Sequence, residues 1–473
     1  MTTLRFHGSA AVLLLPLALF VAVTARLFIS EAAFDLTGLA AAGVLTLFSG
    51  SLLAKSPSEY WKAAVRGASS ELTGTVVLIL IASGIFSAMM KASGVADGLV
   101  FLGGMLHLTG HAFTVFVLLA SSLMAAATGS SIGTLLAAMP IFFPAGVALG
   151  ADPAMLAGAA LGGALRRTSL AARLRRHRHL VGHAALFATA APADIAGVVR
   201  TRLPYAMTAL AVSMPVYAFM GASRPVSEAA LSGDASALLM LVPVAVLIAV
   251  AVRTRDVLMA ISAGAVTGTA TGLLIGRLSF ATIFAADDGR LSGFLISGIS
   301  NVSPIILLCV TLFAFTGIVR EAGVPDMMAK ALEAGSAGRP SALRTELFLS
   351  AATLVVTTLF AAVTSASVAL VGSLTDDIGR ASNVHPYRRS HILSGLANSL
   401  PVLMPFSAFV LITMAAVSGL EGAAAVTPFT LMTAAFYPIA LFLVFGFMVL
   451  TGTGRMMETP EPEAAEAKTA TAL

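Results

Sequence analysis

The chain has 473 residues, of which 58% are hydrophobic and 11% charged, and its mean hydropathy is +0.94. This apolar composition lies outside the range of soluble domains, so the chain is predicted to be an integral membrane protein without a large soluble domain. The formal net charge of +5 comes from Lys and Arg scattered among short loops, which excludes a nucleic-acid footprint. The single cysteine, Cys309, excludes an intrachain disulfide and is predicted to be a small packing residue.

Apolar segments of membrane length recur along almost the whole chain. The first, from about residue 10 to 29, is long for a signal peptide and predicts an uncleaved membrane helix. Further helices or half-helices are predicted at residues 34–54, 73–92, 112–127, 132–149, 152–165, 204–222, 236–252, 256–276, 303–320, 345–363, 366–379, 391–416 and 430–452. Pairing the shorter ones leaves about 11 to 13 crossings in one all-α, polytopic transmembrane domain, residues 1–453. Residues 454–473 are predicted to form a disordered tail on either side of the membrane.

Two polar, helix-breaking runs interrupt these apolar segments, one in each half of the chain. They consist of Thr, Gly and Ser residues: Thr128, Gly129, Ser130, Ser131 and Thr134 in the first run, and Thr364, Ser365 and Ser367 in the second. A loosened backbone is costly in lipid unless it is buried in protein or lines a cavity, where carbonyl and hydroxyl oxygens can hold an ion. One such break in each half is typical of a secondary transporter with repeated, broken helices.

An internal repeat relates the two halves. Helices in both halves end in Gly-Val-x-Asp, at residues 94–97 and 323–326, and Asp97 and Asp326 are predicted to lie in the loops that follow. After each polar break, a loop with Asp152-Pro153 or His385-Pro386 leads to a helix of small residues. The pattern predicts repeats at about residues 70–222 and 300–452. If each repeat has an odd number of crossings they are inverted, with a site at the membrane midplane between the broken helices.

The residue types at the breaks fit a sodium site, because sodium is a hard cation that prefers oxygen ligands. The alternative is that Ser, Thr and Gly only allow close helix packing. Asn398, on the second small-residue helix, is either a ligand or an interhelical hydrogen-bond donor. Asp376 and Asp377, just after the second break, either exchange a proton for sodium or cap a helix end. The run 385–389 is predicted to anchor a helix at the membrane interface.

Together the motifs resemble a known family. They are Thr-Gly-Ser-Ser-Ile-Gly-Thr at 128–134, Thr-Ser-Ala-Ser at 364–367, His-Pro-Tyr-Arg-Arg at 385–389, Leu-Ala-Asn-Ser-Leu-Pro at 396–401 and Pro-Phe-Ser at 405–407. With them, roughly residues 70–450 resemble the NhaC-type sodium/proton antiporter family of the ion transporter superfamily. The resemblance implies sodium/proton exchange, with malate/lactate exchange among relatives.

One segment departs from that family. Six arginines fall within residues 166–178, and no acidic residue occurs between Asp152 and Asp194, where the resemblance places Phe-Gly-Asp and Ser-Asp-Thr-like motifs. Read one base further on, suitable codons for residues 165–167 give Phe-Gly-Asp or Phe-Gly-Glu, and codons for 174–179 give Ser-Asp-Ala-Thr-Ala-Ile. We therefore predict that roughly residues 166–191 come from a local reading-frame slip that weakens or abolishes transport. The alternative is a basic cytoplasmic loop that binds anionic lipid.

The function predicted from the sequence is sodium/proton antiport by alternating access. The second hypothesis is a sodium- or proton-coupled carrier or exchanger of small organic anions, since helix N-termini at the breaks can face anionic groups. A membrane enzyme or scaffold needs a cluster of His, Cys or acidic residues or a soluble domain, which the sequence lacks, so no enzymatic activity and no cofactor are predicted. The expected partners are Na⁺, bound transiently by the residues above, H⁺ and the lipid bilayer of the plasma (inner) membrane. Whether the chain forms a homo-oligomer is left open.

Overall fold

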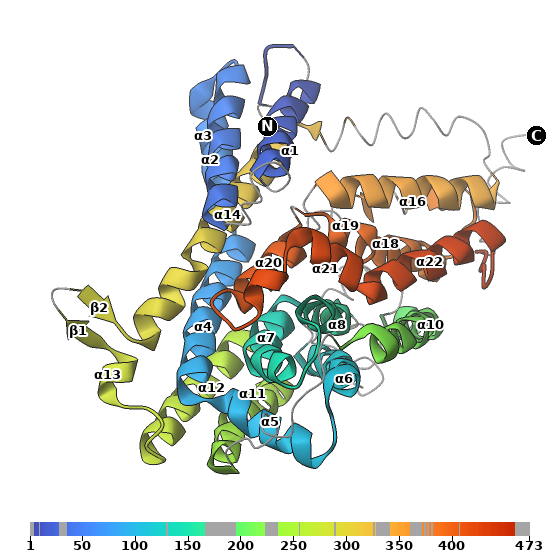
Figure 1. Cartoon of the computed structure of the whole chain (residues 1–473). Helices are drawn as coiled ribbons and strands as arrows, with labels where there is room; N and C mark the ends of the chain where they lie inside the picture. The colour runs from blue at the N-terminus through green and yellow to red at the C-terminus, as the bar shows by residue number, and fades with distance from the viewer. Residues whose placement is uncertain are drawn as a thin grey trace, which may run out of the picture. The chain divides into compact units, whose positions relative to one another are not determined.

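The computed structural model describes residues 4–8, 10–27, 36–128, 131–165, 195–222, 235–254, 256–287, 290–324, 327, 341–359, 371–372, 375, 378–379, 382–405 and 407–458 (Figure 1). Over these residues the chain is helical apart from a short hairpin of β1 (Ala285–Asp287) and β2 (Arg290–Ser292). The predicted class, an all-α polytopic membrane protein, is confirmed.

The helices before the hairpin are α1 (Leu14–Ala25), preceded by the 3₁₀ turn η1 (Ala10–Leu13), α2 (Leu36–Leu53), α3 (Pro57–Ala68), α4 (Glu71–Ser93), α5 (Val95–Met105), α6 (Gly110–Thr128), α7 (Ser131–Ala148), α8 (Pro153–Leu165), α10 (Ile195–Met220), η4 (Ala235–Met240), α11 (Leu241–Thr254), α12 (Val257–Leu274) and α13 (Phe280–Ile283). The helices after it are α14 (Phe294–Glu321), α16 (Ala342–Leu359), α18 (Pro386–Ala397), α19 (Leu400–Leu403), α20 (Ala408–Val417), η5 (Ala423–Ala425), α21 (Pro428–Ala434) and α22 (Phe436–Thr451).

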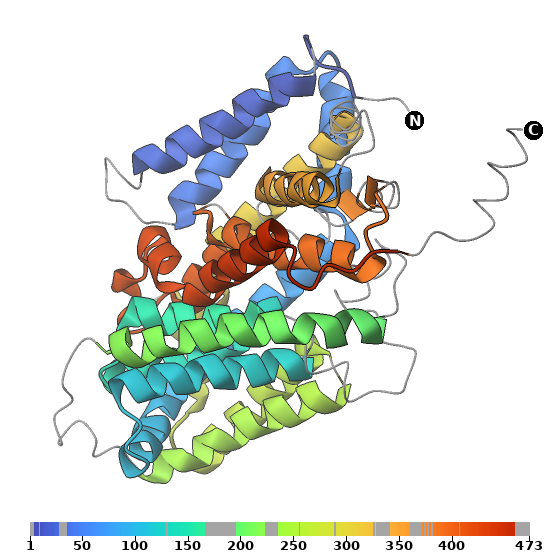
Figure 2. The same cartoon turned by 90° about the vertical axis from the view of Figure 1, so that its right-hand side faces the viewer.

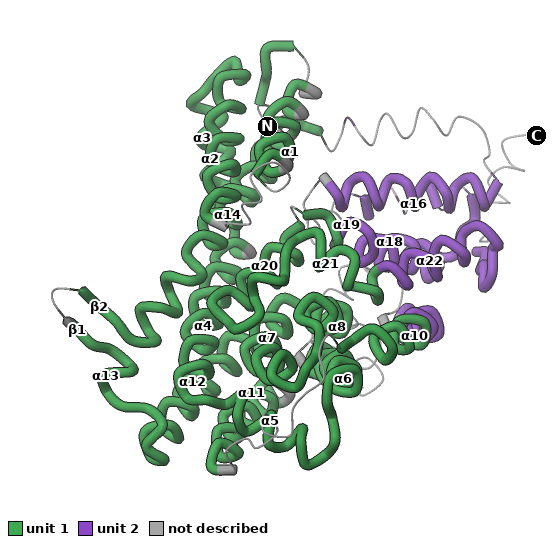
Figure 3. Tube along the Cα trace, in the orientation of Figure 1, with its two compact units in different colours: residues 1–167, 210–325, 403–438 green, residues 168–209, 326–402, 439–473 purple. Residues whose placement is uncertain are grey.

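The chain divides into two compact units, each built from segments of both sequence halves (Figure 3). The first unit comprises residues 1–167, 210–325 and 403–438, and the second comprises residues 168–209, 326–402 and 439–473. This division differs from the predicted division into sequential repeats, which stays a prediction.

Five helical segments in the described residues are long and apolar enough to cross a membrane, or up to eight spans if each sharply bent helix pair counts as one. They are Thr73–Ser93, Ser131–Ala148, Arg200–Met220, Val257–Leu274 and Phe294–Glu321. The predicted total of about 11 to 13 crossings includes segments that lie largely outside the described residues, such as 366–379, and stays a prediction.

In the first unit, α14 packs against α4 along its N-terminal part and against α3 along its C-terminal part (Figure 1). Gly84 and Gly298 form the first contact: a Cβ added to Gly84 would lie 2.4 Å from the Gly298 carbonyl oxygen. At the second contact, between α14 and α3, Gly67 lies against Gly317 in the same way. Small residues therefore let backbones approach closely, as is common between membrane helices. On the same side of this unit α1 packs beside α2 (Figure 2).

Helix ends agree in part with the sequence predictions. Gly94 ends α4 in the left-handed conformation, with φ of 69°, and Gly323 follows α14 with the same φ. Glycine is favoured there because it has no Cβ to clash. The prediction that Asp97 lies in a loop is wrong: Asp97 lies in the first turn of α5, and its carboxylate is 3.6 Å from Arg277 Nη1. The counterpart Asp326 lies outside the described residues.

Two predicted helices are each broken in the structure. The segment 391–416 consists of α18, α19 and α20, and α18 already begins at Pro386. The segment 430–452 consists of α21 and α22, which meet at Ala435 with a bend of 53°. The amphipathic helix α3 was not predicted, although Ser56 and Pro57 supply an N-cap and a first-turn proline.

The core of the second unit contains a buried ion-pair network between α16 and α18. Arg388 and Glu346 are both fully buried, with Nε 2.9 Å from Oε1 and Nη2 3.0 Å from Oε2. Arg455 binds the same carboxylate from the chain after α22, with Nη2 3.0 Å from Oε2. Arg388 and Arg389 of the run 385–389 are thus buried within this unit, and the role of the run as an anchor at the membrane interface stays a prediction.

Candidate ion site at the helix breaks

The first polar break is the turn of a helical hairpin. Helix α6 ends at Thr128, and α7 begins at Ser131 and packs against α6. At the other end of the pair, the Gly110 N–H donates to the Leu149 carbonyl at 2.7 Å. The two helices are thus antiparallel, and the turn brings the C-terminus of α6 together with the N-terminus of α7.

This turn offers both signs of partial charge. The last four carbonyls of an α-helix have no partner within the helix and form its negative end, whereas the first N–H groups form its positive end. The end of α6 can therefore attract a cation, and the start of α7 can attract an anion. The electrostatics of the turn is consistent with either of the two cargo classes predicted from the sequence.

Ser131 is the residue of this break whose surroundings the structure defines best. Its side chain is fully buried, and within the described part of the chain its Oγ has no hydrogen-bond partner. A buried hydroxyl without a partner costs about 1–3 kcal/mol, so a ligand that filled this gap would be stabilised. Thr134, one turn further along α7, is also fully buried. Thr128 is the last residue of α6, and Gly129 and Ser130 lie outside the described residues.

Glycines next to the break serve helix packing, as the alternative hypothesis requires. A Cβ on Gly133 of α7 would lie 2.3 Å from Val257 Cγ1 of α12. A Cβ on Gly163 of α8 would lie 2.5 Å from the carbonyl oxygen of Leu118 in α6. Packing therefore explains the glycines near the break, but it leaves the Ser131 hydroxyl without a partner.

A second group of buried oxygens lies at the end of α18 in the second unit. Asn398 follows the last residue of α18, and its Nδ2 donates to the Ser394 carbonyl of the same helix at 2.8 Å. Asn398 Oδ1 and Ser394 Oγ are buried, and neither has a hydrogen-bond partner among the described residues. Among the described residues, Asn398 donates within its own helix and to no other helix, which favours the ligand role of its two predicted roles. Ser394 was missed by the sequence analysis, although it precedes Asn398 by one helical turn.

The second break itself cannot be compared with the first. Thr364, Ser365, Ser367, Asp376 and Asp377 lie outside the described residues. In the described part of the chain, Glu346 is the one fully buried carboxylate, and both of its oxygens face guanidinium groups of Arg388 and Arg455. These contacts make Glu346 a structural anchor and leave it no free oxygen edge for a transported ion.

The break between α21 and α22 has a protein partner in place of an ion. The Tyr217 hydroxyl donates to the Ala434 carbonyl at 2.9 Å and accepts from the Phe436 N–H at 3.0 Å. One side chain thus satisfies the backbone groups on both sides of Ala435. Breaks of this kind are structural, which distinguishes them from the break at Ser131.

Comparison with known proteins agrees with this transporter-like arrangement. Residues 3–166 match the Na⁺/H⁺ antiporter family. The match confirms the resemblance to a sodium/proton antiporter family that the motifs predict, and the protein is accordingly a membrane transporter. It covers α6, α7 and the first break, and it ends one residue after α8, where the arginine-rich segment begins.

The other comparisons are weaker. The YdaH transporter of Alcanivorax borkumensis, a solved structure, is 13% identical in sequence and covers 83% of this chain and 88% of its own length, with a TM-score of 0.39. At this TM-score no helix of the chain is equated with one of YdaH. No curated protein matches the chain.

Proposed function

We propose that the protein is a sodium/proton antiporter that works by alternating access. The observation that carries this proposal is the set of buried, unpartnered oxygens at the helix breaks, with Ser131 Oγ in one unit and Asn398 Oδ1 in the other. Sodium takes oxygen ligands and needs no charged cage, so such oxygens and the freed carbonyls at the end of α6 suit it. Thr128, Gly129, Ser130 and Thr134 complete the ligands proposed for the first unit, and Thr364, Ser365 and Ser367 are the ligands proposed from the second polar run.

The proton requires a group that binds either H⁺ or Na⁺. Glu346 is held by two arginines and is not available for this task. The described residues contain no other fully buried carboxylate. We assign it to Asp376 or Asp377, which follow the second break in the sequence. The family resemblance also places acidic residues in the first half, where this chain carries arginines instead.

Matched elements support a repeated architecture for the carrier. Helices α8 and α18 both begin at a proline, and their N-termini are capped by Asp152 and His385. Each packs against the helix that precedes a polar run, α8 against α6 and α18 against α16. We propose that these pairs belong to two inverted repeats of a plasma (inner) membrane carrier.

The second candidate function is transport of a small organic anion. The N-terminus of α7 at the break favours it, because the partial positive charge of a helix N-terminus attracts a carboxylate. In cotransport with sodium, the negative end of α6 would attract the sodium ion and the positive end of α7 would attract the organic anion. Flux of labelled lactate or a dicarboxylate separates this function from antiport.

Reconstituted vesicles test the proposal. A sodium gradient imposed across vesicles that contain the full chain and a pH-sensitive dye should drive proton movement without any organic solute. Ser131→Ala should reduce this flux, whereas Ser122→Ala on α6, whose Oγ already bonds to the Leu118 carbonyl at 2.7 Å, should not. Proton movement that needs an added organic anion would favour the second function, and flux equal to that of empty vesicles would contradict both for this chain.

A further inference from the structure

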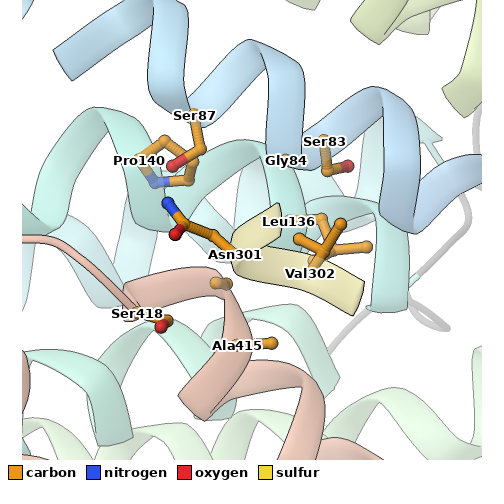
Figure 4. Close-up of a pocket in the computed structure, with 10 residues that line it drawn as sticks. Ser83, Gly84, Ser87, Leu136, Pro140, Asn301, Val302, Ala415 and Ser418 are labelled. Atoms are coloured by element: carbon orange, nitrogen blue, oxygen red, sulfur yellow. The ribbon is translucent and has the colours of Figure 1, made fainter. Parts of the chain in front are cut away.

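A small internal cavity lies in the first unit, away from the helix breaks (Figure 4). It is enclosed by α4, α7, α14 and the end of α20, and its volume is about 20 Å³. On this measure roughly 10–15 Å³ is enough for one water molecule, so the cavity also has room for an unhydrated sodium ion, which is smaller than water. A wider cavity of about 380 Å³ shares Asn301 and Ser418 with it and leads outward.

Three polar side chains of α4 and α14 line this chamber: Ser83 is buried, Ser87 is half-buried, and Asn301 is exposed where the chamber meets the wider cavity. Ser83 of α4 is 3% exposed, and its Oγ has no hydrogen-bond partner among the described residues. Figure 4 shows the Asn301 carboxamide of α14 pointing toward Ser87 of α4 beside Pro140 of α7, with its nitrogen nearer to Ser87 than its oxygen. A buried polar group at membrane depth is expensive unless something binds it. A ligand bound in the chamber would therefore be stabilised by the unpartnered Ser83 hydroxyl.

Two prolines add backbone oxygens to these side chains. Pro140 lies inside α7 and has no N–H, so it leaves the carbonyl of Leu136, four residues earlier, without its helical hydrogen bond. Pro304 in α14 does the same for Ser300. Leu136 lines the chamber and Ser300 lines the wider cavity outside it. Each proline thus frees the carbonyl of a residue that lines one of the two adjoining cavities.

Helix α20 directs its negative end to the same place. It ends at Val417, and two residues of its last turn, Ala415 and Ala416, line the chamber. The Ala415 carbonyl already accepts from the Ser418 N–H at 3.1 Å, so the attraction for a cation here comes from the partial negative charge of the helix C-terminus as a whole. Just beyond this end, the Lys91 ammonium group donates to the Gly419 carbonyl.

From these features we infer a second site for a monovalent cation of the size of sodium, centred on Asn301 and separate from the helix breaks. Its ligands are the hydroxyls of Ser83 and Ser87, the Asn301 carboxamide oxygen and the freed carbonyls. Among the described residues that line the chamber, none is Asp, Glu or His, so the site favours a singly charged ion over a divalent or transition metal. The site lies on the inner side of the wider cavity, which gives it a route to water.

Binding of ²²Na⁺ to the purified full chain tests this inference. Asn301→Leu and Ser83→Ala should each weaken one class of bound sodium about tenfold or more, because each removes an oxygen ligand. Asn301→Asp should strengthen the same class about tenfold by adding a negative charge. The control is Ser303→Ala on the same helix, since the Ser303 hydroxyl is exposed and bonds to the Ile299 carbonyl at 2.8 Å; it should bind like the unmodified chain.

Unchanged sodium binding in Asn301→Leu and Ser83→Ala would overturn the inference, as would Asn301→Asp that binds no more tightly than the unmodified chain. Unchanged binding in Asn301→Leu and Ser83→Ala is the result expected if the chamber holds only water. Because Asn301→Asp is expected to gain affinity, its outcome does not depend on whether the other variants fold. The test is also separate from the proposed antiport, since a chain that moves no protons can still bind sodium in this chamber, and Ser131→Ala should leave this class of binding intact.

Discussion

Arg388 and Glu346 form a bidentate ion pair that is fully excluded from solvent, although 42 residues separate them in the sequence. Arg455 closes the pair from the segment after α22, so one carboxylate holds α16, α18 and the C-terminal segment together. The Arg388 guanidinium also donates to the Met448 and Thr453 carbonyls, at 2.6 and 2.8 Å. Glu346 thus fastens three segments of the second unit to one another.

Glu346→Gln should destabilise the protein by about 3 kcal/mol, because it leaves two guanidinium groups without their counterion and one of them is fully buried. Thermal or denaturant unfolding followed by circular dichroism measures this loss. The matched control is Glu59→Gln, whose carboxylate pairs with Lys62 on the surface and whose side chain is 46% exposed; it should change stability by less than about 1 kcal/mol. Equal effects of the two substitutions would contradict the anchoring role of Glu346.

The sequence could not reveal this anchor. The run at residues 385–389 reads as a cluster of polar and basic residues next to apolar helices, which is typical of a membrane interface. Its partner Glu346 is a lone acid in an otherwise apolar helix, and nothing local links the two. Helix ends were easier to predict, because Gly94 and Gly323 act through their own backbone conformation.

Tyr217→Phe should destabilise the protein by about 1–3 kcal/mol, because the lost hydroxyl leaves the Ala434 carbonyl and the Phe436 N–H without a partner. The same unfolding measurement applies. Tyr205→Phe is the control, since its hydroxyl makes one long contact of 3.4 Å with the Thr453 carbonyl. If the two variants were equally stable, the hydroxyl would not be what holds the break between α21 and α22.

Ser131→Ala separates a ligand role from a packing role. As the buried Ser131 Oγ has no partner among the described residues, its removal should leave stability unchanged or raise it by up to about 1 kcal/mol. The same substitution should weaken the apparent sodium affinity of proton flux about tenfold. A loss of stability without a change in sodium affinity would instead support packing.

Asn398→Leu and Ser394→Ala should act in the same way from the second unit. Both remove a buried oxygen that has no partner in the described residues, so each should weaken the apparent sodium affinity about tenfold. Ser399→Ala is the neighbouring control, because the Ser399 hydroxyl is already bonded to the Leu396 carbonyl at 2.6 Å. Sodium affinity that fell only in Ser399→Ala would exclude Asn398 and Ser394 as ligands.

The polar breaks could be located from sequence because Ser, Thr and Gly stand out within apolar helices. The chamber at Asn301 could not, since Ser83, Leu136 and Asn301 come from three distant helices and only the packing of α4, α7 and α14 brings them together. Pro140 and Pro304 were the available signals, because a proline inside a membrane helix frees a carbonyl. The break at Ala435 between α21 and α22 could not be predicted either, because the residues around it form one apolar run in the sequence.

The arginine-rich segment gives the last prediction. If roughly residues 166–191 come from a slipped reading frame, the gene across this window should encode Phe-Gly-acid and Ser-Asp when read one base further on. The family match supports this hypothesis, since it ends at residue 166, where the segment begins. The frame-corrected chain should then carry the acidic residues that the family resemblance places there and should show sodium-driven proton flux at least about tenfold above the chain as written.

The matched control replaces the six arginines between residues 166 and 178 with glutamine, which removes charge but restores no acidic motif. Under the frame-slip hypothesis this control should stay as weak as the original chain. Under the lipid-binding alternative, the original chain should transport well, and the control should lose its dependence on anionic lipid in the vesicles. Codons that cannot give Phe-Gly-acid and Ser-Asp in the shifted frame would end the frame-slip hypothesis before any flux is measured.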